Sequence, residues 1–131
     1  MEDIKPREVA WRFDGRDWVL RCNNNVLAEV QIVNGGNFGP VLSRKRTLKS
    51  VLQLLAAMLN DYADEQKWVD EKGFAITYTE KQLGRRLSYD TVDRLAPDIM
   101  RMTILAVNET DDEKKAETME AEAAVSTSHG T

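Results

Sequence analysis

The segment from residue 47 to residue 71 constrains the fold more than any other part of the sequence. Its apolar side chains recur every three or four positions, which predicts a long amphipathic α-helix. Ser43 or Thr47 can cap its start and Gly73 can end it. Such a helix needs an apolar surface to cover its stripe, which consists of Leu48, Val51, Leu52, Leu55, Met58, Leu59 and Tyr62.

The preceding segment is expected to supply that surface as a three-stranded antiparallel meander over residues 8–33. The stretches "EVAWRF" and "WVLRC" alternate as strands do, and "DGRD" between them is a hairpin signal. Asparagines 23–25 indicate a second turn, followed by a third strand. The predicted register pairs Phe13 with Trp18 and Cys22 with Val26, so that one aromatic face packs on the long helix. The predicted fold class is therefore α+β.

Short helices are expected to complete the body. Thr79 and Gln82 form a capping-box pattern that opens a helix ending near Leu87. A second helix is predicted from Ser88 or Asp90 to Ala96, before Pro97. Residues 74–78 fit a fourth short strand, and residues 98–107 fit either helix or strand, with helix favoured. We expect one body over residues 1–107, with its smaller helical part at 79–107.

Charge separates this body from residues 108–131. The later segment holds seven acidic residues and two lysines, whereas the body holds 15 acidic and 16 basic residues. The overall charge of −4 therefore comes from the end of the chain, and the body is compatible with an anionic partner. The low hydrophobicity predicts a flexible acidic tail, or at most a frayed helix over 112–124. It can solubilise the protein, compete for the body's basic residues or attract a basic partner.

No catalytic or metal-binding pattern is present. The single histidine, His129, lies near the end of the acidic segment, and Cys22 is expected on the inward face of a strand. We therefore expect no enzyme activity, no cofactor and no metal. One cysteine, no long apolar run and an N-terminus without signal-peptide features predict a cytoplasmic protein.

The stretch "NGGNFGPVLSRKRTLK" is the strongest candidate for anion binding. Its glycines do not fit a phosphate-binding loop, because no lysine followed by serine or threonine stands at the required position. The charges that follow lie at the expected helix N-terminus, where the helix dipole disfavours cations. They indicate either a solvated helix end or an anionic partner, and comprise Arg44, Lys45, Arg46 and Lys49.

Three antiparallel strands followed by a helix entered through "KRTLK" resemble the second half of double-stranded RNA-binding domains, although Leu48 replaces an alanine of that family's basic motif. The order is also similar to the three-stranded arm-binding domains of tyrosine recombinases. The resemblance implies DNA or RNA contacts by the basic cluster, with Arg12 and Arg21 on the open sheet face. Inward aromatics and a nearly neutral body argue against it. A helix-turn-helix cadence at 79–95 has too short a central spacing.

These observations favour a small non-enzymatic accessory or regulatory protein that binds another macromolecule, with a protein as the expected partner. It resembles the accessory proteins of bacteriophages and mobile elements. Candidate contacts are Val19 and Leu27 on the outer sheet face, and Trp68 and Val69 late on the long helix. The alternative is a nucleic-acid-binding module that uses the basic helix N-terminus and the open sheet face.

Overall fold

The computed structural model describes residues 7–37 and 47–128, with side chains described as far as Asn108. The fold is α+β, as predicted, but its sheet has two antiparallel strands instead of three. None of the helices in the described ranges is long and apolar enough to cross a membrane. The elements are β1 (Glu8–Phe13), β2 (Arg16–Arg21), α1 (Asn24–Val33), α3 (Leu48–Gln66), α4 (Glu80–Arg86) and α5 (Tyr89–Ser128).

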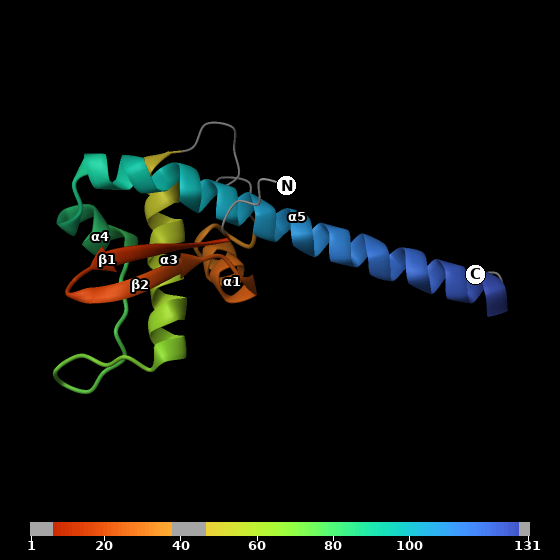
Figure 1. Cartoon of the computed structure of the whole chain (residues 1–131), viewed down its shortest axis with the longest axis horizontal. Coiled ribbons are helices and arrows are strands. Elements are labelled where there is room, and N and C mark those ends of the chain that lie inside the picture. Colours follow the sequence, from red (N-terminus) through yellow and green to blue (C-terminus); the bar gives the residue numbers. More distant parts are fainter. Residues whose placement is uncertain (1–6, 38–46, 129–131) are drawn as a thin grey trace.

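Helix α3 forms the centre of the molecule (Figure 1). It contacts β2, α1, α4 and α5, so it is buried on more than the single stripe that the sequence predicts. Leu54, Ala56 and Ala57 are buried as well, whereas Leu48 is half exposed. Thr47 caps the helix start by accepting a hydrogen bond from the backbone of Ser50. The largest fully buried side chains of the core are Trp18, Leu20, Leu54, Leu55, Met58, Leu59, Leu83 and Ile99.

The helix ends earlier than expected, at Lys67 instead of Gly73. Lys67 adopts the left-handed conformation with φ of 57°, and the Trp68 N–H bonds the Ala63 carbonyl at 3.0 Å. This is the 6→1 hydrogen bond of the Schellman motif, which ends a helix with a residue in the left-handed conformation. Trp68 and Val69 consequently lie on a loop and not on the helix.

The β-hairpin is present, but its predicted register is wrong by two residues. Asp14 and Gly15 alone form the turn, with φ of 53° and 73°, as two-residue hairpin turns require. The strands therefore pair Phe13 with Arg16, and the preceding rungs pair Trp11 with Trp18 and Val9 with Leu20. Because the shift is even, the same side chains still face the core.

The predicted third strand is wrong, because residues 24–33 form helix α1. The Asn23 side chain accepts hydrogen bonds from the backbone N–H groups of Asn25 and Val26 at 3.0 and 3.1 Å. It therefore acts as a helix cap instead of a turn residue. Val26 and Val30 are both buried, and their spacing of four fits one face of a helix as well as one face of a strand.

The C-terminal part begins with the predicted capping box: the Gln82 N–H donates to Thr79 Oγ1 at 3.1 Å, and the Thr79 N–H donates to Gln82 Oε1 at 2.8 Å. Residues 74–78 form no strand and contribute only an isolated bridge between Val69 and Ala75. Residues 98–107 are helical, as favoured.

Helix α5 is longer than the helix that the sequence predicted to end at Ala96. The helix continues through Pro97, which is exposed, so water can replace the backbone hydrogen bond that proline cannot donate. It also continues as helix from Asn108 to Ser128, where the sequence predicted a flexible tail or at most a frayed helix over 112–124, and extends well beyond the other elements (Figure 1). The segment contains five glutamates and four alanines, which favour helix, and the preceding turns supply the nucleus.

Candidate functional site

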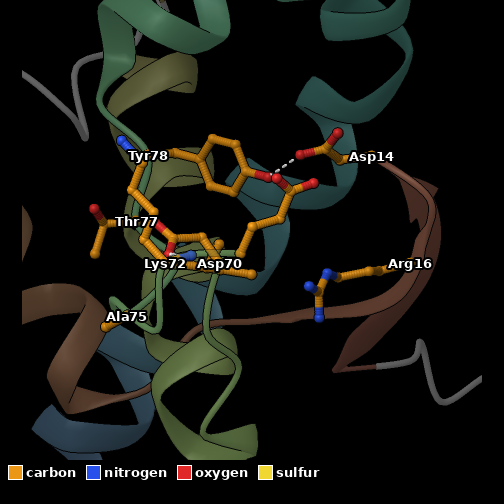
Figure 2. A pocket seen from close by; sticks show the side chains of 9 residues that line it. Asp14, Arg16, Asp70, Lys72, Ala75, Thr77 and Tyr78 are labelled. Carbon is orange, nitrogen blue, oxygen red and sulfur yellow. Dashed lines mark hydrogen bonds between the residues drawn. The ribbon is translucent and has the colours of Figure 1, made fainter.

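A pocket of about 630 Å³ lies between the β1–β2 turn and the loop that follows α3 (Figure 2). Two segments distant in sequence thus form one concave, polar surface. Its lining residues are Asp14, Arg16, Asp70, Glu71, Lys72, Ala75, Ile76, Thr77 and Tyr78.

One side of the pocket is held together by Asp14, Tyr78 and Arg86. The Arg86 guanidinium binds both carboxylate oxygens of Asp14, at 2.7 and 3.0 Å, and lies over the Phe13 ring at 5.0 Å. The Tyr78 hydroxyl donates to the same carboxylate at 2.5 Å (Figure 2). These contacts tie the hairpin turn to α4 and to the end of the loop.

The same contacts shift the ionisation of all three groups. Hydrogen bonds from Arg86 and then Tyr78 lower the pKa of Asp14 from 3.8 to about 2. Burial, followed by the bond to Asp14, raises the pKa of Tyr78 to about 12. The bond to Asp14 also raises the pKa of Arg86. Asp14 is therefore a charged structural group at neutral pH, unsuited to acid–base catalysis.

The loop over residues 67–78 has an ordered backbone. The Asp70 N–H bonds the Phe74 carbonyl at 2.8 Å, and the Ile76 N–H bonds the Trp68 carbonyl at 3.2 Å. The Asp70 carboxylate also accepts from the backbone N–H groups of Lys72 and Phe74 at 2.8 and 3.0 Å. At the end of the loop, the Asn60 side chain bonds both the N–H and the carbonyl of Tyr78.

The loop is anchored at its start by Trp68 and presents apolar side chains beyond it. The Trp68 ring meets the rings of Trp18 and Tyr62 edge-on, with centroids 4.9 and 5.5 Å apart, and Arg16 lies 4.9 Å over it. Val69 and Phe74 are 50% and 68% exposed. Val69 is paired with Ala75 across an isolated bridge, and consecutive residues of an extended segment point to opposite sides. Phe74 therefore lies on the opposite face of the loop from Val69.

The structure separates the four predicted protein-contact residues. Val69 is exposed on the loop and Trp68 is half-buried at its base, whereas Val19 is half-buried on β2. Leu27 is only 6% exposed, because it lies on α1 and not on an outer sheet face. Phe74 was missed because the alternation of residues 74–78 predicted a fourth short strand and not an exposed loop.

The predicted anion-binding residues do not form one group in the described ranges. Lys49 is exposed on the first turn of α3, while Arg44, Lys45 and Arg46 lie outside those ranges. Arg12 pairs with Asp17 at 2.9 Å. Arg21 pairs with Glu65 and lies over the Tyr62 ring.

The described side chains contain no cluster of three or more metal-ligand residue types. Burial raises the pKa of the Cys22 thiol to about 11, so this thiol is protonated and a poor nucleophile at neutral pH. Comparison of the chain with protein-family models, curated proteins and solved structures gives no match.

Proposed function

We propose that this chain is a small non-enzymatic accessory protein that binds another protein through the loop at residues 67–78. The observation that carries the proposal is Phe74, an aromatic side chain 68% exposed on a loop with an ordered backbone. Aromatic residues, phenylalanine included, are enriched in protein interfaces relative to the rest of the surface. An ordered loop also loses little conformational entropy on binding, which favours affinity.

The neighbouring pocket places charged side chains near these exposed apolar residues. Arg16 and Lys72 contribute positive charge, and Asp70 and Glu71 contribute negative charge. A partner segment that carries an apolar side chain flanked by charges of both signs matches this surface. Ile32 and Val33 are also exposed. They lie close in sequence to residues 38–46, which are outside the described ranges, so their exposure is weaker evidence for a binding surface.

The test is site-specific photo-crosslinking in cells that express the protein. A photoreactive residue replaces Phe74 or Val69 in two variants, and replaces Lys81, which is exposed on α4, in the control. We expect a discrete protein adduct from position 74 or 69 and none from position 81. Excess unlabelled protein should compete the adduct away, whereas the F74A variant should not.

Equal adducts at all three positions, or none at positions 69 and 74, would contradict the proposal. The nucleic-acid alternative is tested by fluorescence anisotropy with labelled DNA and RNA at two salt concentrations. Salt-sensitive binding that is unchanged by F74A and lost when Arg44, Lys45 and Arg46 are replaced by alanine would favour that alternative.

A further inference from the structure

Strand β1 has an open edge. It pairs with β2 on one side, and in the described ranges no further backbone hydrogen bond joins it to another segment. The two-residue turn makes Phe13–Arg16 a hydrogen-bonded pair, and such pairs alternate along an antiparallel ladder. The backbone N–H and C=O groups of Glu8, Ala10 and Arg12 therefore point away from β2.

Apart from the oppositely charged Glu8 and Arg12, this edge lacks the features by which edge strands usually resist pairing. β1 is six residues long and contains no proline, no lysine and no bulge. Ala10, at its centre, is small and exposed. β2, in contrast, packs against α3 and α5 (Figure 1), so β1 offers the more accessible of the two edges.

The sequence of β1 is complementary to itself in the antiparallel direction. With Ala10 opposite Ala10 of a second copy, Glu8 of each copy lies opposite Arg12 of the other. The same register places Val9 opposite Trp11, at the closely spaced type of pair where cross-strand side chains meet most directly. A shift of two residues instead puts Glu8 or Arg12 opposite the neutral Ala10.

We propose that a second copy of this chain docks on β1, so that two hairpins form a continuous four-stranded antiparallel sheet with a two-fold axis at Ala10. Two Glu8–Arg12 pairs and two Val9–Trp11 pairs fix the register. In each copy Trp11 is already stacked on Phe13, with ring centroids 4.7 Å apart, and this stack is half-buried. The proposal concerns a different surface from the loop at 67–78 and does not depend on a partner protein.

The first test is the molar mass of the full chain by light scattering and sedimentation. The Ala10 N–H points away from β2, so A10P removes an intermolecular donor and leaves the hairpin's own hydrogen bonds in place. A10S keeps the N–H group and serves as the matched control. We expect dimers for the unmodified chain and A10S, and monomers with an unchanged far-UV circular dichroism spectrum for A10P. A monomeric unmodified chain, or a dimeric A10P, overturns the proposal.

Two further measurements decide the register, also in the event that A10P does not fold. E8R and R12E should each weaken dimerisation by about two- to thirty-fold, because each gives two symmetric cross-strand pairs like charges. Each variant also opposes like charges within its own hairpin, where Glu8 faces Arg21 and Arg12 pairs with Asp17, but this effect is the same in either variant alone and in a mixture. An equimolar mixture of E8R and R12E should recover dimerisation, because every intermolecular pair is then between opposite charges, and failure of the mixture to do so contradicts the pairing.

Cysteine crosslinking provides the second measurement. With Cys22 replaced by serine, A10C should form a disulfide across the axis, where paired Cα atoms are about 5.5 Å apart. R12C should not, because its two copies are about 14 Å apart in this register. Equal crosslinking of both variants, or crosslinking of R12C alone, refutes the register.

Discussion

Replacing Asp14 by asparagine tests the contact that ties the hairpin turn to the rest of the molecule. Asparagine has the same shape and tolerates the positive φ of 53° at this position, so the substitution removes the charge without straining the turn. We expect D14N to be less stable than the unmodified protein at neutral pH. The loss should come from the bidentate bond to Arg86 and the bond from Tyr78.

The magnitude follows from the pKa of Asp14, which is lowered from 3.8 to about 2. At 1.36 kcal/mol per pKa unit, the full shift corresponds to about 2.5 kcal/mol. The Asp14 and Arg86 side chains are 40% and 44% exposed, and solvent screening reduces this contribution to about 1 kcal/mol. Because the folded-state pKa is lowered, the stabilisation is complete above pH 4 and is lost as the pH falls toward 2.

Urea unfolding of D14N and the unmodified protein at several pH values measures this contribution. The difference in unfolding free energy should be about 1 kcal/mol at pH 6, and about half of that at pH 3. D17N is the control, since its exposed pair with Arg12 should contribute less than about 0.5 kcal/mol. A difference that stays constant from pH 6 to pH 3, or no difference at pH 6, would refute the reasoning.

Three further substitutions probe other parts of the fold. Y78F should remove the ionisation step near pH 12 from a spectrophotometric titration and lower stability by about 1–2 kcal/mol, since it removes a hydrogen bond to a charged group. N23A should cost about 1–2 kcal/mol in urea unfolding, because it removes the cap of α1 and the 2.6 Å hydrogen bond from the Asn23 amide to Asp61. P97A should raise the thermal midpoint, with a gain of about 2 kcal/mol from restoring a helical hydrogen bond; an unchanged midpoint would contradict the cost assigned to Pro97.

The parts of the fold that local residues determine were predictable. The apolar stripe of α3, the capping box at Thr79 and the presence of a hairpin at Gly15 each depend on residues a few positions apart, although the turn is two residues shorter than predicted. Helix α1 was not, because the spacing of Val26 and Val30 satisfies both helix and strand periodicity. Contacts with α3 favour the helix: Asn23 and Asn25 bond Asp61, and Asn34 bonds Gln53.

The candidate site was predictable only in part for the same reason. Trp68 and Val69 could be named from their apolar character, but their position on a loop depends on the early end of α3 at Lys67. Arg86 lies 72 residues from Asp14 in sequence, and no local pattern connects them. The packing of α4 on α3 brings these two residues together, and the spacing of residues in the sequence does not predict that packing.

Within the described ranges the sheet has two strands, which bears on the stability of the hairpin itself. An isolated two-stranded hairpin is marginal in water, and additional strands or packing against a helix must support it. Here β2 receives that support through buried Trp18 and Leu20, whereas the inward side chains of β1 are only partly buried against the core. In the proposed dimer, β1 gains a second neighbour.

Hydrogen exchange should then show the amides of Ala10 and Arg12 protected at high protein concentration and exposed on dilution. The amides of Val9 and Trp11, which bond β2, should stay protected throughout. Equal concentration dependence at all four amides would indicate that the hairpin unfolds as a whole, and would contradict pairing confined to the outer edge of β1.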